Sequence, residues 1–124
     1  MRVLVVDDSD IGRMMVIFGL DGSCVCDEAS DGMEALDLFT KASAAGQPYD
    51  LVFMDIVMPN MDGKAALRKI RKHEEGTGSG RTPVYMVSAS EMIDDVAELA
   101  DGLLRKPTPR QQFQEIVAGL RDIV

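Results

Sequence analysis

Residues 51–63, with the sequence Leu-Val-Phe-Met-Asp-Ile-Val-Met-Pro-Asn-Met-Asp-Gly, constrain the fold of this chain more than any other stretch. The apolar run 51–54 predicts a strand buried on both faces, and Asp55 follows it directly. In open parallel α/β sheets, ligands bind beyond the carboxyl ends of the strands, so this position favours a functional role for Asp55. The alternative is that Asp55 caps the next helix, but Asp62 lies closer to the start of that helix.

The rest of the chain alternates apolar runs of strand length with helical periodicity. We expect strands at residues 2–6, 24–29, 51–54, 84–87 and 103–104. We expect helices at about residues 10–19, 33–44, 63–75, 91–100 and 109–123. Such alternation predicts the α/β class, with a doubly wound, five-stranded parallel sheet in the order 2-1-3-4-5 and five helices, of which the fourth is short. We predict a single domain over residues 1–124.

Apolar residues at helical spacing give the predicted helices a face toward the core. In the first, the residues at helical spacing are expected to face the core: Ile11, Met14, Met15 and Phe18. In the third, Ala66, Leu67 and Ile70 are expected inward, and a basic stripe is expected outward: Lys64, Arg68, Lys69, Arg71 and Lys72. His73, the only histidine, is interpreted as a surface residue.

The charge balance limits the classes of partner. A net charge of -8 opposes binding to nucleic acid or to an anionic membrane, because both require a basic surface. No apolar run approaches the roughly 20 residues of a membrane-spanning helix. Cys24 and Cys26, two residues apart on one strand, suit neither a relaxed disulfide nor a zinc site and are interpreted as reduced packing residues. We therefore expect a cytoplasmic protein.

The predicted strand ends carry a set of chemically related side chains. The first strand is followed by Asp7 and Asp8, the third by Asp55, the fourth by Ser88 and the fifth by Lys106. The predicted strand order brings these ends to one edge of the sheet. Clustered carboxylates repel one another unless a cation lies among them, and an open site with oxygen ligands suits Mg²⁺.

Three motifs in this order resemble the response-regulator receiver domain of two-component signalling: Val-Val-Asp-Asp at 5–8, Met-Asp-Ile-Val-Met-Pro-Asn-Met-Asp-Gly at 54–63 and Leu-Leu-Arg-Lys-Pro at 103–107. The resemblance covers essentially the whole chain and implies the flavodoxin-like, or CheY-like, form of the sheet. It also implies a cis Lys106–Pro107 peptide bond.

The resemblance further implies the role of each site residue. Asp55 accepts a phosphoryl group from a sensor histidine kinase or a histidine phosphotransfer protein, with Lys106 and Mg²⁺ neutralising the charge. Asp8, Asp55 and the backbone carbonyl of Val57 bind Mg²⁺ directly, and Asp7 acts through a metal-bound water. The Ser88 hydroxyl then binds a phosphoryl oxygen.

The implied function is a phosphorelay switch that acts by protein binding. Phosphorylation changes the surface formed by the expected helix at 91–100, the strand at 103–104 and the last helix, which then binds a downstream protein target. The chain is not expected to be an enzyme, since it catalyses only its own phosphoryl transfer and dephosphorylation. A stand-alone regulator, a phosphate shuttle and a receiver excised from a hybrid kinase all fit the sequence.

The sequence departs from the family pattern at several positions. Leu103 occupies the place of an aromatic residue that changes rotamer with the switch. Ser88 and Lys106 are about one helical turn closer than expected, so the helix between them should be stunted or irregular. Neither Val57 nor Ser90 has a carboxylate or amide that could orient water, from which we hypothesise slow self-dephosphorylation. The alternative is that both residues only pack at the rim of the site.

Three alternative functions fit the sequence less well. A magnesium phosphatase of the haloacid-dehalogenase type would have a second aspartate where this chain has Val57. A flavodoxin-like electron carrier would need a hydroxyl-rich phosphate loop after the first strand, where Asp7 and Asp8 repel phosphate. A degenerate receiver would lack part of the set of strand-end residues, which is complete here.

Overall fold

The computed structural model describes residues 1–20, 22 and 24–123. Within these residues the chain forms five β-strands, four α-helices and one 3-10 helix. The strands are β1 (Arg2–Val6), β2 (Val25–Ala29), β3 (Leu51–Asp55), β4 (Val84–Ser88) and β5 (Gly102–Arg105). The helices are α1 (Asp10–Gly19), α2 (Gly32–Ala44), α3 (Gly63–Thr77), the 3-10 helix η1 (Asp94–Val96) and α4 (Arg110–Ile123).

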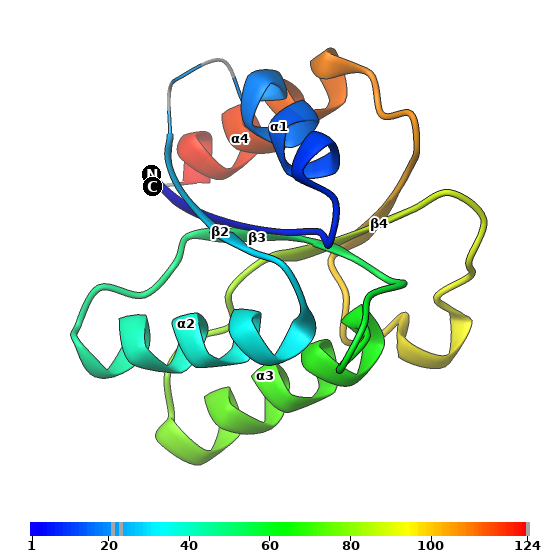
Figure 1. Ribbon diagram of the computed structural model, residues 1–124. Coiled ribbons are helices and arrows are strands. Elements are labelled where there is room, and N and C mark those ends of the chain that lie inside the picture. The colour runs from blue at the N-terminus through cyan, green and yellow to red at the C-terminus, as the bar shows by residue number, and fades with distance from the viewer. Residues whose placement is uncertain (21, 23, 124) are drawn as a thin grey trace.

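The sheet has the predicted topology. All of its strand pairs are parallel, and the strand order is β2-β1-β3-β4-β5. Helices α1 and α4 cover one face, and α2 and α3 cover the other (Figure 1). The expected doubly wound α/β fold is therefore confirmed, with one α-helix fewer in the described residues than the five expected. No described helix has both the length and the apolar character needed to cross a membrane.

Alternate residues of the central strands fill two separate cores, which explains their uninterrupted apolar sequences. Val5 and Phe53 belong to the core beneath α1 and α4. Leu4 and Met54 belong to the core above α2 and α3. The Phe53 ring meets Phe113 of α4 edge to face, with centroids 5.3 Å apart. Helices packed on both faces of β3 thus hold the end of this strand in place.

Side-chain caps start three helices where the sequence changes from strand to helix. Ser9 accepts a hydrogen bond from the backbone N–H of Gly12, and Asp62 accepts one from Ala65. Asp31 caps α2 in the same manner. Because Asp62 caps α3, the alternative that Asp55 serves as this cap is excluded, and Asp55 is available at the end of β3.

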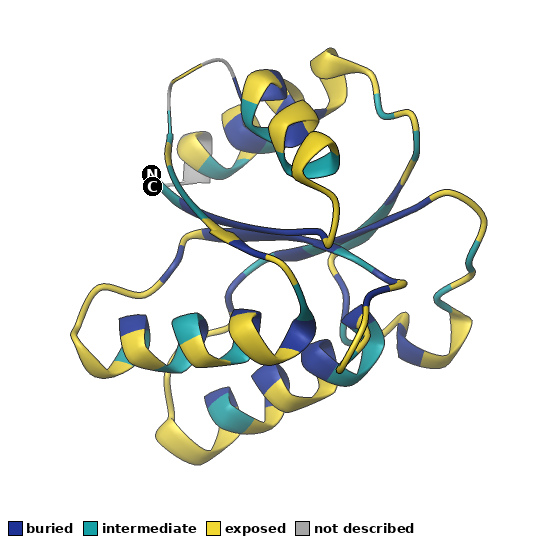
Figure 2. Ribbon diagram, viewed as in Figure 1, coloured by how far each residue is buried: buried dark blue, intermediate teal, exposed yellow. Residues whose placement is uncertain are grey.

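Helix α1 forms as predicted, but the orientation expected for its apolar stripe was wrong. The four residues of this stripe lie at the surface: Ile11 (71% exposed), Met14 (52%), Met15 (58%) and Phe18 (67%). Much of the outer side of α1 is accordingly coloured as exposed in Figure 2. Val16, Gly19 and Leu20 are buried instead. Gly19 allows α4 to approach closely, since a Cβ at this position would lie 2.5 Å from the Phe113 ring. This close contact turns the larger apolar residues of α1 outward.

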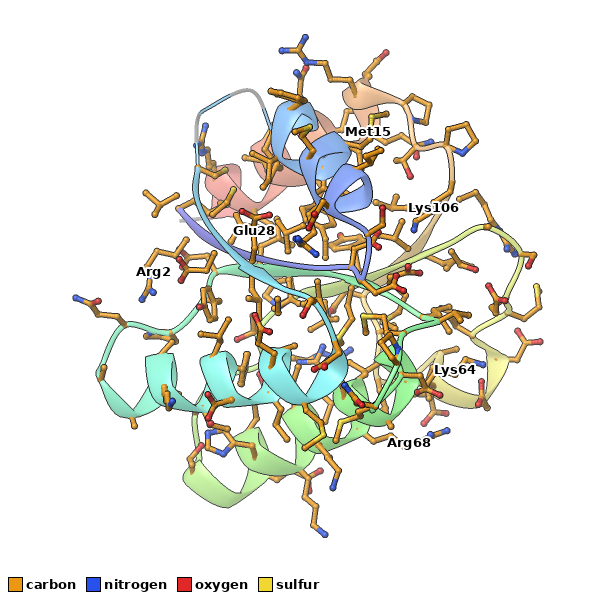
Figure 3. All side chains as sticks on the ribbon, in the orientation of Figure 1. Arg2, Met15, Glu28, Lys64, Arg68 and Lys106 are labelled. Atoms are coloured by element: carbon orange, nitrogen blue, oxygen red, sulfur yellow. The ribbon has the colours of Figure 1, made fainter. Side chains whose placement is uncertain are left out.

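The connection between β4 and β5 also differs from the prediction. The expected helix at 91–100 is reduced to the short η1, so the stunting expected from the Ser88 to Lys106 spacing goes further than anticipated. Polar contacts with α3 hold the segment instead. Lys64 Nζ lies 2.8 Å from an Asp95 carboxylate oxygen, and Arg68 lies 3.3 Å from the other (Figure 3). So short a segment gains little from internal helical hydrogen bonds, and contacts with α3 decide its shape.

Arg71 was predicted to point outward with the basic stripe, and this prediction was wrong. Its side chain is 7% exposed and donates to the Glu74 carboxylate at 2.8 Å and to Asp101 at 3.0 Å. It also donates to the carbonyl oxygens of Leu99 and Thr82, both at 2.8 Å. The guanidinium carries several donors in a fixed plane, so one residue can satisfy partners on three segments. Arg71 therefore ties the end of the β4–β5 connection to α3.

The surface position predicted for His73 was also wrong. Its ring is partly buried and meets Phe39 of α2 edge to face, with centroids 6.2 Å apart. Within the described part of the chain, its buried Nε2 has no hydrogen-bond partner. His73 contributes to the contact between α2 and α3 and does not belong to the strand-end site.

Cys26 lies on β2 and Cys24 directly precedes this strand, which starts one residue later than expected. Both pack against the core beneath α1 and α4. Burial, together with nearby Cys24, Asp27 and Glu28, raises the pKa of Cys26 to about 11. The Cys26 thiol therefore stays protonated at neutral pH, which fits a packing role.

Candidate functional site

The three predicted carboxylates meet at the carboxyl edge of the sheet. Val6 of β1 lies opposite Met54 of β3. The residues that follow them, Asp7 and Asp55, are therefore neighbours at the ends of the two strands. Carboxylate oxygens of Asp7, Asp8 and Asp55 lie within 4.8 Å of one another. Asp7 is buried and Asp8 is exposed, so the cluster is enclosed by protein at Asp7 and accessible to solvent at Asp8. Hard oxygen donors in a partly hydrated cluster fit Mg²⁺.

Lys106 completes this cluster. Its Nζ lies 3.0 Å from Asp7 Oδ2 and 3.1 Å from Asp55 Oδ2. The Lys106 backbone N–H donates to the Ser88 carbonyl oxygen at 2.8 Å, which fixes the start of the loop after β5. The peptide bond between Lys106 and Pro107 is cis, as the resemblance implied.

Burial opposes the charges in this cluster, while the ion pairs favour them. Burial raises the pKa of Asp55 above its ordinary value, Lys106 pulls it down, and the nearby Asp7 carboxylate raises it again. For Lys106, burial alone would lower the pKa, but hydrogen bonds with Asp7 and Asp55 raise it overall. The ammonium is therefore firmly protonated, whereas the Asp55 carboxylate remains incompletely compensated. A cation at this site would relieve that imbalance.

Two glycines permit the close packing of the site. A Cβ at Gly63 would lie 2.1 Å from the backbone oxygen of Asp55, and a Cβ at Gly12 would lie 2.2 Å from Asp7 Oδ2. Real Cβ contacts are far longer, so any side chain at Gly63 would displace the backbone at Asp55. Helix α3 can thus start directly against the end of β3.

The loop between β3 and α3 contains the predicted metal ligand Val57, whose side chain is 58% exposed. Asn60 has a positive φ of 64°, a conformation that asparagine tolerates better than most residues. Its side chain donates to Asp31 at 2.7 Å. The loop is therefore anchored to the start of α2, and Val57 lies two residues beyond Asp55 on the open side of the site.

Ser88 lies at the end of β4, one residue beyond Val87, which pairs with Asp55. The Ser88 side chain is fully buried. Its hydroxyl donates to the Glu91 carboxylate at 3.0 Å and accepts from the Glu91 backbone N–H at 2.7 Å. Glu91 is therefore part of the site, although sequence reasoning assigned it only to a helix. The signal was the pattern Ser-Ala-Ser-Glu at 88–91, which matches the spacing of a capping box.

An apolar groove adjoins the site on the side of α1. It has a volume of about 310 Å³, and its lining includes Met15 of α1, Lys106, Pro107 and Phe113. Met15 and Lys106 are labelled on the same side of the molecule in Figure 3. The exposed stripe of α1 is thus continuous with the residue that contacts the Asp55 carboxylate.

The chain is similar to known proteins over almost its whole length. A family model described as "Response regulator receiver domain" matches residues 3–118. A two-component response regulator of rice, ORR41, is 38% identical over 127 residues, covering 97% of this chain and 94% of that protein. The probable histidine kinase 2 of Oryza sativa subsp. indica is 34% identical over 134 residues, and the match covers 97% of this chain but 13% of the kinase.

Solved structures give the same result. The receiver domain of the histidine kinase CKI1 from Arabidopsis thaliana, complexed with Mg²⁺ and BeF₃⁻, has a TM-score of 0.76 and 33% identity, with 98% of this chain and 89% of that chain covered. The acidic cluster at Asp7, Asp8 and Asp55 fits Mg²⁺ binding of the kind that this relative displays. The match to the family model extends over nearly the whole chain. The chain belongs to the family of response regulator receiver domains of two-component signalling.

Proposed function

We propose that this chain is a phosphorylation-controlled switch whose acceptor is Asp55. The main support is the position of the Asp55 carboxylate. It lies at the end of β3, within the acidic cluster and 3.1 Å from the Lys106 ammonium. A carboxylate is a competent nucleophile for phosphorus, and phosphoryl transfer depends on positioning and charge neutralisation. Both requirements are supplied at this edge of the sheet.

The reaction is transfer from a phosphohistidine of a sensor kinase or phosphotransfer protein. An Asp55 carboxylate oxygen forms the new P–O bond while the P–N bond of the donor breaks, and the imidazole nitrogen leaves with the bonding electron pair. Lys106 balances negative charge on the transferring group. The chain catalyses its own phosphorylation and dephosphorylation and turns over no separate substrate.

The proposed cofactor is Mg²⁺. Asp7, Asp8, Asp55 and the backbone carbonyl of Val57 would hold it, and it would supply charge neutralisation to the phosphoryl oxygens. Asp55 supports this assignment because its charge is incompletely compensated by Lys106 alone. The open side of the cluster, next to exposed Asp8, leaves room for phosphoryl oxygens.

The apolar stripe of α1 is the proposed docking surface for the phosphodonor. Contiguous apolar residues at the surface commonly mark interaction sites. This stripe continues through Met15 into the groove that contains Lys106 and Pro107. A donor whose histidine reaches Asp55 must also cover this flank, so an apolar helical surface around that histidine is the occupant that fits. The output surface for a downstream protein lies around η1, β5 and α4, next to Ser88.

Intact-mass analysis after incubation with acetyl phosphate tests the proposal. The wild-type chain should gain one hydroxylamine-labile phosphoryl group in the presence of Mg²⁺ and none after chelation. Asp55→Asn should gain none, whereas Asp37→Asn should behave as wild type, because Asp37 is paired with Lys41 on the surface of α2. No adduct in the wild type, or an adduct that persists in Asp55→Asn, would overturn the proposal.

A further inference from the structure

The Ser88 hydroxyl is fully engaged by the two residues that follow Ala89. A hydroxyl has one proton to donate and two lone pairs with which to accept. The backbone N–H groups of Ser90 and Glu91 donate to it at 3.2 Å and 2.7 Å. Its proton faces Glu91, with the carboxylate Oε2 at 3.0 Å and the backbone oxygen at 3.3 Å. A new acceptor can gain this proton only by displacing Glu91.

The Glu91 carboxylate is a strong competitor for that proton. Hydrogen bonds to ionised acceptors are stronger than those between neutral groups. The Ser88 hydrogen bond, aided by the backbone N–H groups of Glu91 and Ser90, holds the pKa of Glu91 below its ordinary value. Glu91 is therefore ionised at neutral pH and presents an anion to Ser88 from within the chain.

A phosphoryl group on Asp55 would need the same proton. Val87 pairs with Asp55 across β3 and β4, and Ser88 is the next residue of β4. In this register Ser88 carries the β4 hydroxyl closest to a phosphoryl group on Asp55. One proton cannot serve two anions, and the anions repel each other. We propose that Glu91 is a positioning residue that competes with the phosphoryl group for the Ser88 hydroxyl and so sets how readily phosphorylation reaches the β4–β5 connection. This inference rests on the proposed function.

Displacement of Glu91 would be transmitted through Arg105. Arg105 pairs with Ser88 in the sheet and donates to the Glu91 backbone oxygen at 3.1 Å and to Met92 Sδ at 3.1 Å. The side chain of Met92 is 55% exposed. Loss of the Ser88–Glu91 hydrogen bond therefore lets residues 90–92 and the Arg105 side chain move together. This movement changes the position of the exposed Met92 side chain next to β5.

Beryllofluoride, an inert mimic of the phosphoryl group, tests this competition. Its affinity in the presence of Mg²⁺ can be measured by NMR titration of the intact chain, following the amide signals of Ser90 and Arg105. Glu91→Ala should bind beryllofluoride about three- to tenfold more tightly than wild type, the effect of one net hydrogen bond. Glu98→Ala should match the wild type, since Glu98 is an exposed glutamate of the same connection and its side chain lies outside the Ser88 contacts.

A double-mutant cycle separates competition from a general loosening of the loop. In the Ser88→Ala background, Glu91→Ala should give no further gain, because the shared proton is gone. Equal affinity of Glu91→Ala and wild type would overturn the inference, as would a gain that persists without Ser88. If no variant binds beryllofluoride, wild type included, the proposed function itself fails and the inference falls with it. Glu91→Gln retains an acceptor without the charge and should bind with intermediate affinity.

Discussion

Lys106 Nζ lies 3.1 Å from Asp55 Oδ2, although 51 positions separate the two residues in the sequence. The contact exists because β5 and β3 flank β4 in the same parallel sheet and end at the same edge. Lys106 also pairs with Asp7 at 3.0 Å, and Asp7 is likewise distant from it in the sequence. The site is therefore assembled only when the whole sheet has formed, and its electrostatics can be tested through folding stability.

Replacement of Asp55 by asparagine should stabilise the chain in the absence of divalent cations. Burial and the nearby Asp7 carboxylate raise the folded-state pKa of Asp55 above its unfolded value. Lys106 opposes this shift but does not cancel it. The ionised carboxylate thus destabilises the folded state at neutral pH, and this effect is lost as the pH falls through the folded pKa toward the ordinary value of about 4. Asp55→Asn should melt about 3 °C above wild type at pH 7, with a smaller difference at pH 4.

Thermal unfolding followed by circular dichroism measures this difference. Asp37→Asn, on the surface of α2, serves as the control and should not show the same pH dependence. Addition of Mg²⁺ should raise the melting temperature of the wild type more than that of Asp55→Asn, because a ligand that binds the folded state stabilises it. A difference between Asp55→Asn and wild type that stays constant from pH 7 to pH 4 would contradict the prediction.

Gly63→Ala should destabilise the fold by about 1–3 kcal/mol, as expected when a methyl group is forced into a packed site. The new Cβ would lie 2.1 Å from the Asp55 backbone oxygen. Gly76→Ala in the same helix is a matched control, because a Cβ there meets nothing within 4 Å. It should stabilise the chain by about 0.5–1 kcal/mol. Urea unfolding of both variants checks the prediction, which fails if the two changes have the same sign.

Arg71→Met should lower the free energy of unfolding by about 3 kcal/mol. The change leaves the buried Glu74 carboxylate without its partner and removes the hydrogen bonds to Leu99 and Asp101. Arg68→Met, on the exposed side of the same helix, should lower it by less than about 1 kcal/mol. Chemical denaturation of the two variants distinguishes a buried anchor from a solvated ion pair, and similar losses would refute the distinction.

The double variant Met15→Gln/Phe18→Gln should slow phosphotransfer from a phosphorylated histidine protein roughly tenfold, since both residues lie on the proposed docking surface. Phosphorylation by acetyl phosphate should not change, because a small donor needs no docking surface. Met33→Gln, an exposed apolar residue of α2 on the other face of the sheet, provides the control. Equal slowing with both donors would locate the defect in the site itself and not in docking.

Val57→Asn and Ser90→Glu should each accelerate loss of the phosphoryl group, by about tenfold for a change of roughly 1.4 kcal/mol in the barrier. Both positions are exposed beside the site, and each new side chain can orient water toward the acyl phosphate. The decay of the phosphorylated species, timed by intact mass, measures the effect. The hypothesis of slow self-dephosphorylation is rejected if neither variant decays faster than wild type.

The sheet and the edge at which the site lies could be predicted because strand runs, breaks and carboxylates follow each other in the sequence. The stripe of α1 was misassigned because periodicity identifies an apolar face without saying what covers it. Small Gly19 lets Phe113 approach, and the larger residues turn outward. Arg71 was misassigned for a related reason, since its buried partners Thr82, Leu99 and Asp101 come from segments distant in sequence.

Arg71 anchors one end of the β4–β5 connection and so limits how much chain entropy changes when this connection switches between its two states. Arg71 fixes residues 99 and 101 to α3, whereas the Ser88 hydroxyl holds the backbone of residues 90 and 91, with Arg105 as a further donor to the Glu91 oxygen. Release of Ser88 therefore lets the segment pivot about its far end without becoming disordered. Because few residues gain conformational freedom, the two states differ little in chain entropy, and a modest interaction energy suffices to exchange one for the other.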